Sequence, residues 1–130
     1  MKLKLLTPLL LILTLAFSSP SFSEWTAVAA SAETRVYVDF ERIRKIDGYL
    51  YIWDLTEYFK PDEYGVMSGK GYRQADCKLF RFKWLSLSFH KDPMGGGINE
   101  VENLIKKTQD WEYASPNSLD EIILNKVCSR

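Results

Sequence analysis

The N-terminal segment from Met1 to Ser23 constrains this chain most, because it has the layout of a secretory signal peptide. Two lysines precede an apolar stretch from Leu5 to Phe17. Small residues, Ser21 and Ser23, occupy the two positions that a signal peptidase inspects before the expected cleavage point after Ser23. A retained membrane anchor is the alternative, but a spanning helix needs about 20 apolar residues. We therefore expect residues 1–23 to be removed and residues 24–130 to form one exported domain.

The two cysteines are the next constraint, because an exported chain folds in an oxidising compartment. Cys77 and Cys128 lie 51 positions apart in the expected mature chain. We expect one disulfide between them, which the chain-entropy model values at about 4 kcal/mol. A redox pair and a metal site are the alternatives, although a CxxC motif is absent and structural zinc needs four ligands.

The composition indicates a globular domain. Residues 24–130 carry 15 basic and 17 acidic side chains, and 14% of the whole chain is aromatic. A disordered chain would have few aromatic residues and a large net charge. A nucleic-acid-binding protein would carry a basic surface, so nucleic acid is not an expected partner.

The hydrophobic pattern predicts strands followed by a C-terminal helix. Expected strands cover Trp25–Ala30, Arg35–Asp39, Tyr49–Tyr58, Asp76–His90 (one long strand or a bent pair) and Trp111–Tyr113. One or two helical turns are expected in Asp39–Ile46, followed by a turn at Asp47–Gly48. Lys60–Ala75 is expected to be a loop, with a short edge strand or a turn of helix inside it as the alternative, and a short helix is expected around Val101–Lys107. Ser118 and Glu121 form a capping box before an apolar stripe that ends at Val127. This order predicts an α+β fold with an antiparallel sheet.

The two longest predicted strands carry many aromatic residues. If these strands pair with matching register, one sheet face would hold Tyr49, Tyr51, Trp53, Phe80, Phe82 and Trp84. A single helix covers only one sheet face, and an uncovered aromatic face usually marks an interface. The six residues are therefore a candidate interface for dimerisation or partner docking; burial under the 60–75 loop is the alternative.

Two cations fall on the other face of the second strand. Arg81 and Lys83 alternate with its aromatic residues, on the face that carries Cys77. If the helix covers this face, Arg81 is a candidate contact for an anionic ligand. The alternatives are a bulge that turns both cations outward, or pairing with acidic residues: Asp39, Asp54 or Glu57.

The chain shows no arrangement typical of an active site. His90 is the single histidine, and we expect it to be a polar residue at a strand end rather than a catalytic base. The acidic pairs Asp62/Glu63 and Glu100/Glu102 lack the oxygen set that calcium needs. Gly95–Gly97 is expected to be a turn rather than a phosphate-binding loop. We predict no catalytic residue, metal or cofactor, and no enzyme activity.

An ordered set of short motifs resembles the surface-adhesin protein E-like family of Gram-negative bacteria, over about Trp25 to Cys128. The motifs are Val36–Asp39, Tyr51–Leu55, Asp76–Leu79 with Arg81, Met94–Gly97, Trp111, Pro116–Ser118 and Val127–Cys128. The resemblance implies a PAS-like antiparallel sheet with a C-terminal helix on its concave side, tethered by a disulfide. It also implies a dimeric outer-membrane lipoprotein that binds extracellular-matrix-type host proteins.

These observations together predict an exported, non-enzymatic binding domain. The first hypothesis is an adhesin-like envelope or extracellular module that binds a protein partner or a second copy of itself. The alternative is a periplasmic small-ligand binder that uses the concavity under the helix. Because no cysteine lies near the expected cleavage point, we expect a periplasmic or secreted protein, with association with the cell surface as the other location. After signal cleavage we expect no membrane span.

Overall fold

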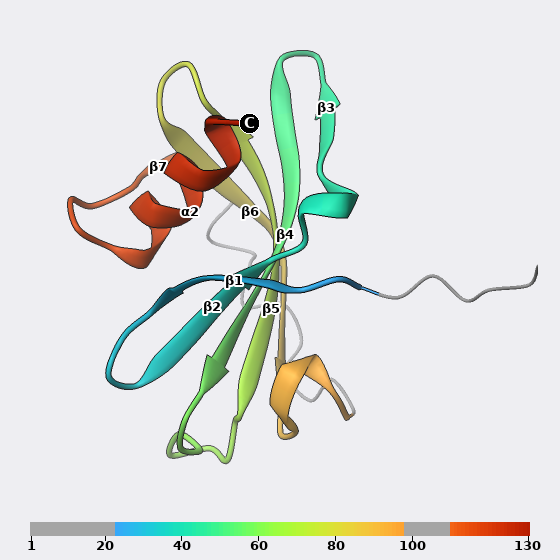
Figure 1. The fold of residues 1–130 in the computed structure, drawn as a ribbon, viewed down its shortest axis with the longest axis vertical. Helices are drawn as coiled ribbons and strands as arrows, with labels where there is room; N and C mark the ends of the chain where they lie inside the picture. The colour runs from blue at the N-terminus through green and yellow to red at the C-terminus, as the bar shows by residue number, and fades with distance from the viewer. Residues whose placement is uncertain (1–22, 98–109) are drawn as a thin grey trace, which may run out of the picture.

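The computed structural model describes residues 23–97 and 110–130. Most of the expected signal segment and the expected helix at 101–107 lie outside these residues. One seven-stranded sheet dominates the fold, with the strand order β1-β2-β4-β5-β6-β7 and β3 also paired to β4 (Figure 1). The strands are β1 (Thr26–Ala30), β2 (Thr34–Val38), β3 (Arg44–Ile46), β4 (Tyr49–Tyr58), β5 (Ser68–Asp76), β6 (Arg81–His90) and β7 (Glu112–Tyr113).

All strand pairs are antiparallel, and β4 is the central strand. One edge of β4 pairs with β2 along its second half and with β3 along its first half. The other edge pairs with β5 over nearly its whole length. A short 3₁₀ turn, η2 (Phe40–Arg42), leads into β3, and a second, η3 (Pro93–Gly95), follows β6.

The single described α-helix, α2 (Leu119–Cys128), lies against the inner face of the curled sheet, between β1–β2 and β6–β7 (Figure 1). It begins at Ser118, whose hydroxyl accepts a hydrogen bond from the Glu121 amide at 3.1 Å. Glu121 in turn accepts a bond from the Asn117 amide at 3.2 Å. These bonds satisfy amides that have no partner inside the helix, so the capping residues fix where the helix begins.

The core lies between α2 and the inner face of the sheet. Ile123 and Val127 pack in one cluster with buried residues of β2 and β4, whereas Leu124 packs in a second cluster with Ala75 and Phe82. One helix therefore contacts both halves of the sheet. Together the sheet and helix form a curled half-barrel of the predicted α+β class.

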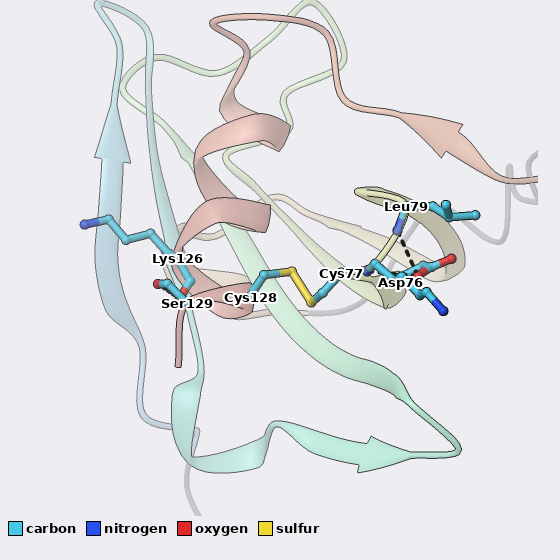
Figure 2. The surroundings of a disulfide bond; sticks show 7 residues. Asp76, Cys77, Leu79, Lys126, Cys128 and Ser129 are labelled. Atoms are coloured by element: carbon cyan, nitrogen blue, oxygen red, sulfur yellow. Dashed lines mark hydrogen bonds between the residues drawn. A yellow bond between two sulfur atoms is a disulfide. The ribbon is translucent and has the colours of Figure 1, made fainter.

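A disulfide joins Cys77 to Cys128, which confirms the predicted bond. Figure 2 shows that it links the end of α2 to the turn that follows β5. The two Cα atoms are 5.5 Å apart, within the ordinary range for a disulfide. The bond therefore holds the C-terminal helix against the β5–β6 side of the sheet.

The predicted strands correspond to β1, β2, β4 and β7, with shifts of one residue at some ends. The predicted Asp47–Gly48 turn is confirmed, with φ values of 52° and 84°, and it joins β3 to β4. The helix is confirmed as α2, which extends one residue beyond the predicted end to Cys128.

Two local predictions were wrong, and a third was right only in part. Ser68–Asp76 is not part of a loop but is strand β5, an interior strand of the sheet. The predicted strand Asp76–His90 is interrupted by a turn over residues 77–80, so β6 begins only at Arg81. The stretch Asp39–Ile46 forms a single 3₁₀ turn and then strand β3.

Candidate functional site

The outer face of β4 carries three of the six predicted interface residues. Tyr49, Tyr51 and Trp53 alternate with Leu50 and Ile52, which pack in the core on the α2 side. Because successive side chains of a strand point to opposite faces, the three aromatic rings lie on the face away from α2. Each ring is half-buried, so part of each remains accessible.

The other three predicted residues do not join them, and this part of the interface prediction was wrong. β5 lies between β4 and β6, and the register aligns Ile52 with Arg73 and Arg73 with Trp84. Trp84 and Phe82 therefore share the inner face with Ile52, where Phe82 is buried against Leu124. Phe80 occupies the β5–β6 turn, with a φ of 55°.

Two residues that the sequence analysis did not assign to the interface complete the outer face. Tyr72 of β5 lies 4.6 Å from Trp53 and 6.2 Å from Tyr51, measured between ring centroids. Trp111, just before β7, lies 5.6 Å from Tyr49. These distances are typical of interacting aromatic pairs. We call Tyr49, Tyr51, Trp53, Tyr72 and Trp111 the outer aromatic row.

Cations lie over both ends of the outer aromatic row. At one end, the Arg42 guanidinium lies 5.2 Å from the centroid of Trp53. At the other, Arg81 lies 4.2 Å and the Lys83 ammonium 4.6 Å from the centroid of Trp111. Cations at these distances from an aromatic ring are attracted to its face. The row is therefore an aromatic surface with basic ends.

The surface is hollowed at both ends of the row. A depression of about 320 Å³ is lined by Glu41, Arg42, Ile43, Arg44, Trp53 and Tyr72. A second, of about 420 Å³, is lined by Asp47, Gly48, Tyr49, Asp76, Lys78, Leu79 and Arg81. Hollows beside half-buried rings are places where a partner's side chains can be buried.

Arg81 lies on the outer face, so the condition for its predicted ligand contact, a position under the helix, is not met. Its Nε donates to Asp76 Oδ2 at 2.9 Å, a partner that the sequence analysis did not consider. Burial acts to raise the pKa of Asp76, but hydrogen bonds from Arg81 and from the Leu79 and Lys78 amides outweigh it and lower the pKa below its ordinary value. The ion pair therefore persists at neutral pH and holds Arg81 beside Trp111.

The cation under the helix is instead Arg73, which is 3% exposed. Its Nε donates to Asp54 at 2.6 Å and its Nη1 to Asp120 of α2 at 2.7 Å. Burial acts to lower the pKa of Arg73, but the two carboxylates outweigh it and raise the pKa, so the guanidinium stays charged. The concavity under α2, which was the predicted ligand site, thus contains a paired cation and the apolar side chains of the core.

Within the described residues, no group of three or more His, Cys, Asp or Glu side chains is arranged to hold a metal ion. Across residues 23–97 and 110–130, no helix is long and apolar enough to cross a membrane. His90 is buried at the end of β6, where its Nε2 lies 2.8 Å from the Ser88 hydroxyl.

Comparison with known proteins identifies one family. The family model described as surface-adhesin protein E matches residues 25–129. No curated protein sequence matches significantly. Crystal form II of Haemophilus influenzae protein E has a TM-score of 0.63 and 13% identity, covering 85% of this chain and 91% of that chain.

Two other protein E structures are similar to the same extent. The selenomethionine form from Haemophilus influenzae has a TM-score of 0.62 and 14% identity, covering 85% of this chain and 89% of that chain. Protein E from non-typeable Haemophilus influenzae has a TM-score of 0.57 and 12% identity, with coverages of 87% and 82%. At these identities the likeness establishes a shared fold.

Proposed function

Because the chain belongs to the surface-adhesin protein E family, we propose that it binds a protein partner through the outer aromatic row. Membership makes it an adhesin-like surface protein, and its family is one of binding proteins rather than enzymes. The observation that carries the proposal is five half-buried rings with basic ends on the sheet face that α2 leaves open.

The composition of the row supports this proposal. Protein interfaces are enriched in Tyr, Trp and Arg, and those residues supply most binding hot spots. Trp53 and Tyr72 pack against each other and form part of the wall of the hollow beside Arg42. An incoming apolar or acidic side chain would gain contact with both rings and with the guanidinium.

By analogy with the family, the partner that binds the row is an extracellular-matrix-type protein. The alternative partner is a second copy of this chain. A homodimer through the row would bury the same rings on both subunits. Each end of the row carries both signs of charge, because Arg42 pairs with Asp39 and Arg81 pairs with Asp76. Charge alone therefore does not disfavour a homodimer, and sedimentation velocity distinguishes the two partners.

The test compares Trp53→Asp with Tyr64→Ser, both made in the exported protein. Tyr64 is 74% exposed in the β4–β5 loop, outside the row, so its replacement serves as a matched control. Binding to a panel of immobilised extracellular-matrix proteins, and sedimentation velocity for self-association, are measured for each. We expect Trp53→Asp to weaken the observed interaction by roughly 30-fold or more, the effect of losing a hot spot. Equal binding by both variants, with both folded, would refute the proposal.

The proposed binding function requires that the protein be exported. Residues 1–23 act as a signal peptide that is removed, and residues 24–130 form the mature binding domain. The mature protein is periplasmic or secreted, or is held at the cell surface by its partner. Intact mass of the exported protein tests the cleavage point.

A second candidate function rests on the hollow beside Arg81. We propose that the fold is PAS-like. We also propose, as the alternative function, that the protein binds a small anionic ligand. The hollow of about 420 Å³ combines Arg81 and Lys78 with the Tyr49 ring, but Asp76 already pairs with Arg81. Small anions should raise the melting temperature of the wild type and not of Arg81→Ala; no shift in a screen would exclude this function.

A further inference from the structure

The carboxylate of Asp39 lies fully buried beside the point where the signal segment is expected to end. Asp39 directly follows β2 and is 0% exposed. Its Oδ2 accepts a bond from Arg42 Nε at 2.6 Å and from the backbone nitrogen of Glu24 at 3.2 Å. Glu24 is the first residue after the expected cleavage point. A buried carboxylate and a future chain terminus are thus in direct contact.

The pairing of Asp39 is incomplete. Its Oδ1 is buried and has no hydrogen-bond partner among the described residues. Its one cation, Arg42, has a side chain that is 41% exposed to solvent. A buried charge is costly unless it is paired and fully hydrogen-bonded. The carboxylate is therefore incompletely compensated, and a second cationic donor would stabilise it.

We propose that signal cleavage after Ser23 supplies that donor: the new α-ammonium group of Glu24 forms an ion pair with the buried Asp39 carboxylate. In the precursor, the Glu24 nitrogen is a neutral amide with a single N–H. A signal peptidase adds water across the Ser23–Glu24 bond, so that Ser23 leaves with a carboxylate and the Glu24 nitrogen takes up a proton. The product has three N–H donors and a positive charge at neutral pH, because the ordinary pKa of an α-amino group is about 8.

The geometry favours an α-ammonium group bound at Asp39 over one that is free in solvent. The register of β1 with β2 aligns Thr26 with Val38, which brings Glu24 close to Asp39. Ser23 and Glu24 are both exposed, so the bond to be cut is not buried in the fold. The Ser23 hydroxyl accepts a hydrogen bond from Arg42 Nη2 at 2.9 Å. The separate bond from Arg42 Nε to Asp39 does not involve Ser23, so it remains when Ser23 leaves.

The ion pair has a structural consequence. Chain termini are usually poorly ordered unless something holds them, and Asp39 would hold this one. Trp25 follows Glu24 directly, and Arg42 lies 5.8 Å from its ring centroid and 5.2 Å from that of Trp53. Processing would thereby fix the start of β1 and the Arg42 end of the outer aromatic row.

The experiment uses the full precursor exported from bacteria, so that cleavage and disulfide formation occur normally. Intact mass defines the first residue, and acylation by an amine-specific reagent at neutral pH, followed by peptide mapping, gives the reaction rate of the α-amine. Three proteins are compared: wild type, Asp39→Asn, and a variant with one Gly inserted between Ser23 and Glu24. The insertion keeps Asp39 intact but moves the amine away by one residue, which covers the case in which Asp39→Asn does not fold. For the melting measurement, the insertion is also made in the Asp39→Asn protein.

We expect the wild-type chain to begin at Glu24 and its α-amine to react about tenfold more slowly than that of either variant, the effect of one pKa unit. The insertion should also lower the melting temperature of the wild type by about 5 °C. In the Asp39→Asn protein the insertion should not lower it, because the ion pair is already absent there. A mature chain that begins at another residue, or equal acylation rates in the wild type and the insertion variant, would overturn the inference.

Discussion

Gly71 controls how closely the Trp84 ring approaches the sheet. A Cβ atom built on Gly71 would overlap Trp84 Cζ3, whereas one on Gly69, on the same face of β5, would lie 3.4 Å from the Phe89 ring. We expect Gly71→Ala to reduce the free energy of unfolding by about 1–3 kcal/mol through overpacking. Gly69→Ala is the matched control and should change it by much less. Urea unfolding measures both; equal effects would show that Trp84 yields without cost.

His90 should make stability depend on pH below neutrality. Burial, and then the charge of Lys70, lower the pKa of His90 below its ordinary value of 6.5. Folding therefore favours the neutral ring, so its contribution is complete above pH 6.5 and is lost as the pH falls towards the folded-state pKa.

The wild type should lose up to about 1.4 kcal/mol per pH unit in that window, and His90→Gln should lose less. Urea unfolding at pH 7 and pH 5 checks this expectation. A steeper loss in His90→Gln than in the wild type would contradict it.

The buried ion pairs of Arg73 could not be predicted from the sequence. Its partners Asp54 and Asp120 are 19 and 47 positions away, so no local spacing distinguishes Arg73 from a surface arginine. The capping residues Ser118 and Glu121 were predictable because their bonds join residues within one turn. Local bonds can be predicted from spacing, whereas a buried ion pair depends on the register of strands that only the folded chain defines.

At the scale of elements, β5 was missed because its composition resembles a loop. Gly69, Gly71 and the preceding Gly65 are typical turn residues, and strand propensity scales disfavour glycine. Within β5 the first two serve packing, since they admit the rings of Phe89 and Trp84. Missing this strand made β4 and β6 look like neighbours. That error placed Phe82 and Trp84 on the same face as Trp53.

The disulfide is the strongest tie between α2 and the sheet. It can be removed in a double variant, Cys77→Ser with Cys128→Ser. We expect a loss of about 4 kcal/mol in the free energy of unfolding, the upper value for a loop of this length. Urea unfolding with and without reductant measures it: reductant should reproduce the loss in the wild type and have no effect on the double variant. A wild type insensitive to full reduction would show that packing alone holds the helix.

For the molecule as a whole, α2 connects the two halves of the half-barrel. Ile123 and Val127 belong to the cluster with β2 and β4, and Leu124 belongs to the cluster with β5 and β6. The apolar stripe that predicted the helix, Leu119, Ile122, Ile123 and Val127, explains the contact with β2 and β4. Leu124 lay outside that stripe, so its contact with β5 and β6 was not predicted. The curl of the sheet was not readable from that stripe, because it depends on the order of the strands.

This connection predicts that the domain unfolds as one cooperative unit. Leu124→Ala should remove about 2–5 kcal/mol from the free energy of unfolding, the usual range for such a cavity in a core. Amide hydrogen exchange should show the same loss of protection in β2 as in β6, although Leu124 belongs to the β5–β6 cluster, because global unfolding limits exchange in both. Ile46→Ala is the control: Ile46 is 48% exposed on β3, so protection should change little. Loss of protection confined to β5 and β6 would mean that the two halves of the sheet are stabilised separately, with α2 acting as a cover for each and not as the link between them.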